Sequence, residues 1–479
     1  DALQHRRVLV AERALQRRQR VLHEAARLVE LVVVVAPAVG GDHVHVAVAA
    51  HGDRDALGLV DPAIGDLHSG FWSSIQHTNT GVTILGIANG RDGLWLYNGS
   101  KWWKATITSA QPNRTLNANK IRCVIVHQRR VFFIEDGTFG VWYLEPDAIQ
   151  GTARFLDFRP LMRDGGDLVA IASQTPTGGR GPSDRLIAVT QAGEMIVFSG
   201  ENPANTATWS FVGVYDVPSP VGERCLMRYG GDLLYASMLG VLEVSALTAT
   251  PDPERPYTAL SDNIRRAYRS AALAGINNPA WGIADNQFHA LTLINAPTET
   301  GSVQFVKSAD VKGRDGWSVF SGLDALCWLS VGNDLYFGKS DGSVFRLAGD
   351  TDDGEAITAY EITAFSNFGV GNRKIFSRCN LVYDNPARVK PRVKLVVNYG
   401  ALPEVPAPTN TFENAKWAWD DINWSLTPLA WTKDQRGQSN AFMGISGNGT
   451  SAAFVHAVSA KGPVTYMGGI IMFQKGGMA

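Results

Sequence analysis

From Phe71 onward, short runs of apolar residues alternate with small groups of Gly, Asn and Asp. Six segments share one layout, in which an apolar run leads into a small polar turn and a second apolar run follows. This layout predicts β-hairpins, because Gly, Asn and Asp adopt the backbone conformations that tight turns between strands require. The turn glycines of the six segments are Gly93, Gly137, Gly193, Gly240, Gly301 and Gly342.

The six turns recur with a loose period. Successive turn glycines lie 44, 56, 47, 61 and 41 residues apart, close to the length of a four-stranded propeller blade. The strands of each hairpin are apolar on both faces, as a small sheet must be when a neighbouring sheet covers each side. We therefore predict a mainly β protein in which residues 71–350 form a β-propeller of about six blades. A pair of β-sandwiches would give similar spacing and is the alternative.

The pattern changes after the acidic stretch that begins at Asp350, where longer strand-like runs follow. We predict a second, sandwich-like β domain over residues 351–479. This region contains four tryptophans, for which core packing or a subunit contact is favoured over a stacking platform for sugars or bases. The candidates for this aromatic interface are Trp417, Trp419, Trp424 and Trp431.

Basic residues alternate at positions 388–394, in the run RVKPRVKL. In an extended strand, alternate side chains point to the same face, so these four would form a basic stripe. One interpretation is an edge strand that its charges keep soluble. The other is a local contact with DNA phosphates or with an acidic neighbouring subunit. The residues concerned are Arg388, Lys390, Arg392 and Lys394.

The first 70 residues form an atypical N-terminal segment. Residues 1–68 contain no Lys, Asn, Tyr, Phe, Trp, Met, Cys, Ser or Thr, but they hold six of the ten histidines. Leucines and valines at roughly helical spacing predict a helical arm over Ala2–Val35. The alternative is that this alphabet reflects a GC-rich gene read in another frame.

Composition gives no bulk reason to expect nucleic-acid or membrane binding, since 44 basic residues balance 45 acidic ones. The four cysteines are far apart and are interpreted as buried thiols, with no zinc or disulfide pattern. The longest apolar run, Leu28–Gly40, is too short to span a bilayer. Histidines such as His127 and His456 are isolated in sequence from catalytic partners, and no recognised enzyme, metal or cofactor motif occurs. We expect a non-enzymatic protein without cofactor or metal.

Several segments together resemble one protein family. They include VHQRRVFFIEDGTFGVWYLEPDAI, RDGGDLVAIAS, YGGDLLYASMLGVLEVS and GWSVFSGLDALCWLSVGNDLYFGKSDGSVFRL. These are similar to the nozzle or hub proteins of short-tailed bacteriophages, the group that includes packaged-DNA stabilisation proteins and some tail tubular proteins. The resemblance covers residues 75–350 well and the C-terminal region more loosely. Residues 1–68 depart from it, because relatives would supply β-strands there.

The resemblance implies a structural subunit of the virion tail, assembled in the host bacterial cytoplasm. Such a subunit forms a ring, commonly a homohexamer, below the portal and the tail adaptor. The ring prolongs the channel, retains the packaged genome and contacts DNA in its lumen without sequence preference. A fibre, spike or needle would dock on its other rim or flank.

The alternative function is a receptor- or glycan-binding propeller of a tail fibre or spike. An exposed cluster of aromatic and carboxylate side chains in a funnel would favour that alternative. Large apolar side faces, made for neighbours in a ring, would favour the nozzle. A glycan hydrolase is the third hypothesis, and it would need a pair of carboxylates facing a funnel.

Overall fold

The computed structural model describes most of the chain from residue 67 onward and three short strands before it. The described residues are 32–36, 45–49, 57–59, 67–79, 81–175, 184–249, 258–286, 290–299, 301–308, 316–340, 342–349, 351–385, 391–401, 403, 405–406, 408, 412–413 and 437–476. The chain divides into two compact units, residues 1–347 and residues 348–479. Both units consist mainly of β-strands in small, almost entirely antiparallel sheets.

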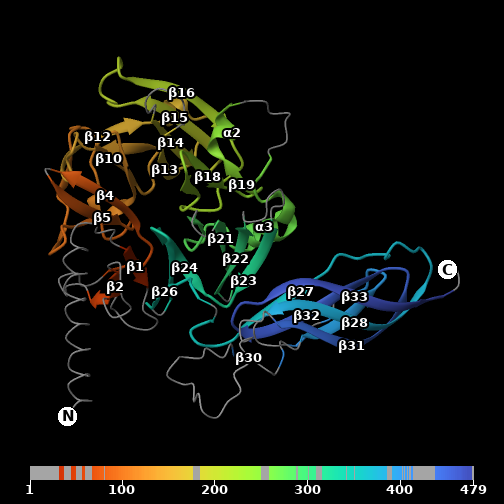
Figure 1. Ribbon diagram of the computed structural model, residues 1–479. Helices are drawn as coiled ribbons and strands as arrows, with labels where there is room; N and C mark the ends of the chain where they lie inside the picture. The colour runs from red at the N-terminus through yellow and green to blue at the C-terminus, as the bar shows by residue number, and fades with distance from the viewer. Residues whose placement is uncertain are drawn as a thin grey trace, which may run out of the picture. The chain divides into compact units, whose positions relative to one another are not determined.

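Seven sheets lie in the described part of the first unit. Six of them, formed by residues 73–346, follow one another along the chain, and Figure 1 shows them arranged in chain order around a common centre. Within each sheet the strands are connected mainly as antiparallel hairpins. The first sheet consists of β4 (Ser73–Asn79), β5 (Val82–Ala88), β6 (Leu94–Tyr97) and β7 (Trp102–Lys104). The second consists of β9 (Ile121–His127), β10 (Arg130–Glu135), β11 (Gly140–Tyr143) and β12 (Gly151–Asp157), with β8 (Ile107–Ser109) parallel to β12. The third consists of β13 (Leu168–Gln174), β14 (Arg185–Thr190), β15 (Glu194–Gly200) and β16 (Trp209–Asp216).

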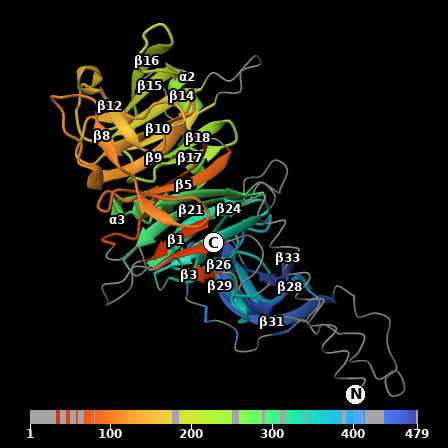
Figure 2. The same ribbon diagram turned by 90° about the vertical axis from the view of Figure 1, so that its left-hand side faces the viewer.

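The next three sheets continue the same plan. The fourth sheet consists of β17 (Leu226–Tyr229), β18 (Asp232–Ala236) and β19 (Val241–Glu243). The fifth consists of β20 (Gly282–Asn286), β21 (Leu291–Thr298), β22 (Gly301–Ser308) and β23 (Gly316–Ser321). The sixth consists of β24 (Ala325–Val331), β25 (Asp334–Lys339) and β26 (Val344–Arg346). Two short α-helices, α2 (Val244–Ala249) and α3 (Arg265–Ala274), lie between β19 and β20 in the chain, and α3 packs beside β21 (Figures 1 and 2). In the described part of the first unit, single-turn 3-10 helices lie at Ala118–Lys120, Arg159–Leu161 and Asp262–Ile264.

The six hairpins expected from the sequence are confirmed. They are the pairs β5–β6, β10–β11, β14–β15, β18–β19, β21–β22 and β25–β26, one in each sheet. Gly137, for example, has a φ of 77° between β10 and β11, a left-handed conformation that glycine adopts without steric cost.

Successive sheets bury each other's faces. Strand β10 is buried at all six positions. Val131 and Phe133 pack toward the β4–β7 sheet, whereas Phe132 and Ile134 pack toward the β13–β16 sheet. Because side chains alternate between the faces of a strand, each sheet contributes to two adjoining cores. Strands at the outer end of a sheet differ, and β16 is exposed at four of its eight positions.

The N-terminal segment supplies strands, contrary to both the helical prediction and the stated departure from the family pattern. Strand β1 (Val32–Ala36) pairs with β2 (His45–Ala49), and β2 pairs with β3 (Leu57–Leu59). Strand β1 lies beside β25 of the last sheet. Four consecutive valines explain the error at residues 32–35, because β-branched side chains favour extended backbone over helix. The rest of the predicted helix, residues 2–31, lies outside the described residues.

The second unit contains two sheets that pack against each other. One has the order β27 (Ile357–Ile362), β32 (Ala452–Lys461) and β29 (Arg392–Val397), with β30 (Phe412–Glu413) parallel to β32. The other has the order β31 (Gly437–Gly449), β28 (Lys374–Asn385) and β33 (Thr465–Lys475). Their shared core includes Phe376 and Cys379 from β28 and Phe454 from β32.

Candidate functional site

A cavity of about 640 Å³ lies where the six sheets of the first unit converge. One edge strand of every one of the six sheets contributes to its wall, namely β4, β9, β13, β17, β20 and β24. Because these strands belong to segments about fifty residues apart in sequence, only the arrangement of the sheets brings them together. One wall residue from each strand, in chain order, is Ser74, Val124, Ala172, Met227, Ile283 and Cys327.

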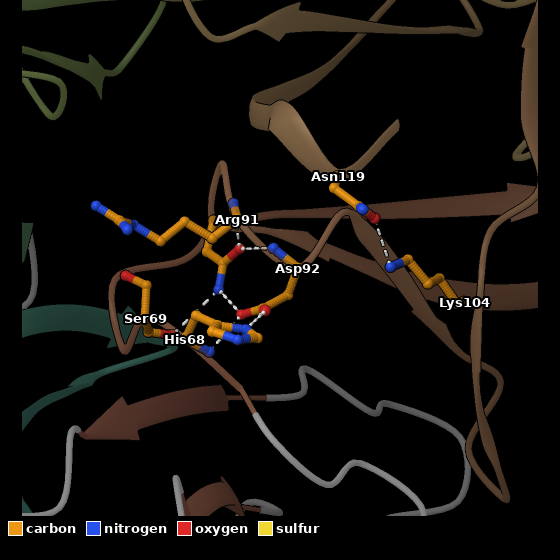
Figure 3. A network of polar contacts seen from close by, with 7 residues as sticks. His68, Ser69, Arg91, Asp92, Lys104 and Asn119 are labelled. Carbon is orange, nitrogen blue, oxygen red and sulfur yellow. Dashed lines mark hydrogen bonds and ion pairs between the residues drawn. The ribbon is translucent and has the colours of Figure 1, made fainter. Parts of the chain in front are cut away.

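A network of hydrogen bonds fixes the chain where it enters the first sheet (Figure 3). The His68 backbone amide donates to Asp92 Oδ2 at 2.9 Å, and His68 Nδ1 lies 2.6 Å from Asp92 Oδ1. Asn89 Nδ2 donates both to Asp92 and to the Ser69 carbonyl. Burial of Asp92 opposes its ionisation, but the hydrogen bonds from Asn89 and His68 outweigh burial and lower its pKa. The network holds residues 70–72 at the cavity wall.

Arg122 on β9 connects three sheets at the cavity. Its Nη1 lies 3.0 Å from Asp136 Oδ1 and 2.9 Å from Glu223 Oε1. Its Nη2 donates to the carbonyl of Leu168, the first residue of β13. The charge of this guanidinium is therefore matched by two carboxylates.

Arg224, two residues before β17, reaches the place where the first and last sheets meet. Its Nη2 donates to the Trp72 carbonyl at 3.2 Å, and its Nη1 donates to the Leu326 carbonyl at 3.4 Å. Its Cζ lies 5.6 Å from the centre of the Phe71 ring. Burial lowers the pKa of the Arg224 guanidinium. Sequence reasoning did not single out this residue, because a lone arginine carries no motif.

The four cysteines are free thiols. Cys123 and Cys327 line the cavity, and Cys225 is fully buried beside Arg224. Burial raises the pKa of all three thiols, which makes them poor nucleophiles and poor metal ligands.

One acidic cluster of the first unit has metal-ligand spacing. Oxygens of Asp164, Glu194 and Asp216 lie within 4.8 Å of one another. The buried Glu194 carboxylate already accepts hydrogen bonds from the backbone amides of Arg163, at 2.8 Å, and Asp164, at 3.2 Å. These bonds give Glu194 a structural role at a chain turn.

A second pocket, of about 370 Å³, lies in the second unit. His456 on β32 is 2% exposed there, and its Nδ1 is 2.8 Å from the Tyr383 hydroxyl of β28. Its Nε2 lies 3.5 Å from Glu361 Oε2 of β27. Burial lowers the pKa of His456 and raises that of Glu361. These partners come from three distant strands, so the sequence showed His456 as isolated.

The predicted basic stripe falls partly on an observed strand. Arg392 and Lys394 occupy alternate positions of β29, which is an edge strand of its sheet among the described residues. Val393, between them, and Leu395, which follows, pack into the core between the two sheets. Arg392 and Lys394 therefore share the opposite face of β29, as expected from the alternation. Arg388 and Lys390 lie outside the described residues, as do Trp417, Trp419, Trp424 and Trp431.

Comparisons with known proteins give no family. No protein-family model matches the chain, and no curated protein matches it. Solved structures that are similar include the computationally designed Ika8 protein, with 14% identity, a TM-score of 0.33, and coverage of 66% of this chain and 82% of that one. A protein described as a 6-phosphogluconolactonase, from Bacteroides fragilis, has 11% identity, a TM-score of 0.39, and coverage of 66% and 93%.

The SapL1 lectin is also similar, with 12% identity, a TM-score of 0.31, and coverage of 58% of this chain and 92% of that one. At such TM-scores the likeness carries no argument about function. Among the described residues, no helix has the length and apolar character needed to cross a membrane.

Proposed function

We propose that the six sheets of the first unit are the blades of a β-propeller. The observation that supports this proposal is the shared cavity, to which each sheet presents one of its edge strands. In a propeller the innermost strands of all blades face one central channel, and each blade is covered by the next. The alternating core of β10 fits the second requirement. The β1–β3 sheet, beside β25, would lie next to the last blade.

We further propose that the chain is the nozzle or hub subunit of a short-tailed phage tail. Sequence resemblance over residues 75–350 supports this function, together with a mainly β first unit that a second β unit follows in the chain. The subunit would assemble as a homohexameric ring between the tail adaptor and a fibre, spike or needle. The ring would retain the packaged DNA and conduct it during ejection. Its role would be mechanical, without a cofactor and without catalysis.

The outer strands of the sheets offer side surfaces for ring neighbours. Phe211 and Val212 on β16 are 49% and 41% exposed, and Val319 on β23 is 57% exposed. Apolar residues exposed on outer strands favour contact with another protein. Head-to-tail contacts between identical subunits close into a ring when the rotation between them is a simple fraction of a turn.

Imaging of the purified, assembled protein tests this function. We expect six-fold rings with an axial channel wide enough for a DNA duplex. Phe211→Ser, which removes a half-exposed ring from the outer strand β16, should weaken ring formation. The nozzle function requires that the wild-type chain forms rings. Particles without rotational symmetry would contradict the proposal.

A glycan-binding assay distinguishes the receptor- or glycan-binding alternative from the nozzle function. The described residues of the cavity wall include one carboxylate, Glu223, which Arg122 engages. This wall does not supply the carboxylate pair of a glycan hydrolase. Binding of bacterial surface glycans by a monomeric chain would favour a fibre or spike component over the nozzle.

A further inference from the structure

The central cavity of the first unit contains a cation whose charge is incompletely matched. Arg224 donates to two backbone carbonyls, those of Trp72 and Leu326. Among the described residues, no carboxylate oxygen lies within 4 Å of its guanidinium, whereas Arg122 on the same wall has two such partners. A guanidinium has five N–H donors and cannot be deprotonated in practice, so it remains charged in this enclosure.

The other charged residues of the cavity wall do not balance the charge of Arg224. The charged residues that line the cavity are Arg122, Arg224, Arg228 and Glu223. Glu223 forms its ion pair with Arg122 and attracts Arg224 only from a longer distance, so one carboxylate among three arginines leaves the lining with an excess of positive charge. The rest of the wall combines apolar side chains such as Leu329 with polar ones such as Gln76. Arg224 is partly buried there, so its remaining donors are open to a solute in the cavity, and their attraction for an anion is stronger than in bulk water.

The volume suits a small molecule. Cavities of about 300–1,000 Å³ are typical of small-molecule sites that combine apolar walls with a few polar groups, and this cavity measures about 640 Å³. Arginine presents a planar fork of donors that matches the paired oxygens of a carboxylate or a phosphate.

We propose that the central cavity binds a small oxyanion, a phosphate or a carboxylate, on the guanidinium of Arg224. The bound anion would accept hydrogen bonds from the donors that the two carbonyls leave unused. It would complete the charge balance at the junction of the first and last sheets, and so stabilise the closed arrangement. This inference rests on the cavity alone and does not depend on the nozzle function.

Isothermal titration of the full chain with inorganic phosphate and, separately, with acetate tests the proposal, with sodium chloride at equal ionic strength as the blank. We expect saturable binding of at least one anion, in the range below about 10 mM, a modest affinity for a ligand of so few atoms. The relative affinities for phosphate and acetate identify which oxyanion the site prefers. Thermal unfolding at rising anion concentration should show a matching increase in Tm.

Three variants separate an anion site from a purely structural cross-link. Arg224→Met removes the charge, and Arg224→Lys keeps the charge but loses the fork. We expect Arg224→Met to abolish binding and Arg224→Lys to weaken it at least tenfold. Arg163→Gln removes an exposed arginine outside the cavity wall and should bind as the wild type does. If Arg224→Met does not fold, the Arg224→Lys titration decides the question. Absence of binding to the wild type, or equal binding by Arg224→Lys, would overturn the proposal.

Discussion

Lys374 provides a sharp test of how the second unit is held together. This residue, the first of β28, is fully buried. Its ammonium donates to the backbone carbonyls of Val370 at 2.5 Å, Asn372 at 3.0 Å and Thr450 at 2.7 Å. The charge therefore ties the loop before β28 to the turn between β31 and β32.

The Lys374→Met variant keeps the length of the side chain but removes all three donors. Hydrogen bonds to charged groups contribute about 1.5–3 kcal/mol each. Part of that sum is offset, because methionine does not bury a charge. We expect a net loss of about 3 kcal/mol in the free energy of unfolding of the second unit. With a urea m-value of about 2 kcal/mol/M, the midpoint would fall by about 1.5 M.

Lys475 offers a matched control, because it lies directly opposite Lys374 in the β28–β33 register but is exposed. Urea unfolding followed by circular dichroism should show Lys475→Met within about 0.5 kcal/mol of the wild type. If Lys374→Met were equally mild, the three carbonyl bonds would not stabilise the unit and the reasoning would be refuted.

Three further outcomes are expected. Because burial lowers the pKa of His456, the unfolded state binds more protons, so stability should fall as the pH drops below about 6.5; His456→Gln should flatten this dependence in pH-series urea melts. Gly193→Ala would place a Cβ 2.3 Å from the Val217 carbonyl oxygen at a φ of 104°, and calorimetry should show a loss of more than about 2 kcal/mol. If Arg392 and Lys394 contact DNA, replacing both with Gln should reduce the slope of log K against log salt by about 2; an unchanged slope would exclude that contact.

The hairpins of the first unit could be predicted because their signals are local. A turn glycine such as Gly137 and the apolar strands on either side of it are adjacent in sequence. The double-sided apolar character of β10 also indicated that sheets would cover both of its faces. The extended backbone at Arg392 and Lys394 could be predicted too, because their alternation with apolar residues is local, and both lie on β29.

The sites could not be predicted, because long-range packing creates them. Arg224 meets carbonyls at residues 72 and 326, one far before it in sequence and one far after. His456 gains Tyr383 and Glu361 only when β27, β28 and β32 come together. The N-terminal error was different in kind. The helical spacing of leucines was given more weight than the β-branched run that forms β1.

The mass of the assembled protein in solution tests the proposed function most directly. Native mass spectrometry of the full chain should give one main species of about 310 kDa, six copies of the 51.8 kDa chain. A single species at 51.8 kDa, unchanged at high protein concentration, would contradict the ring on which the proposed function depends.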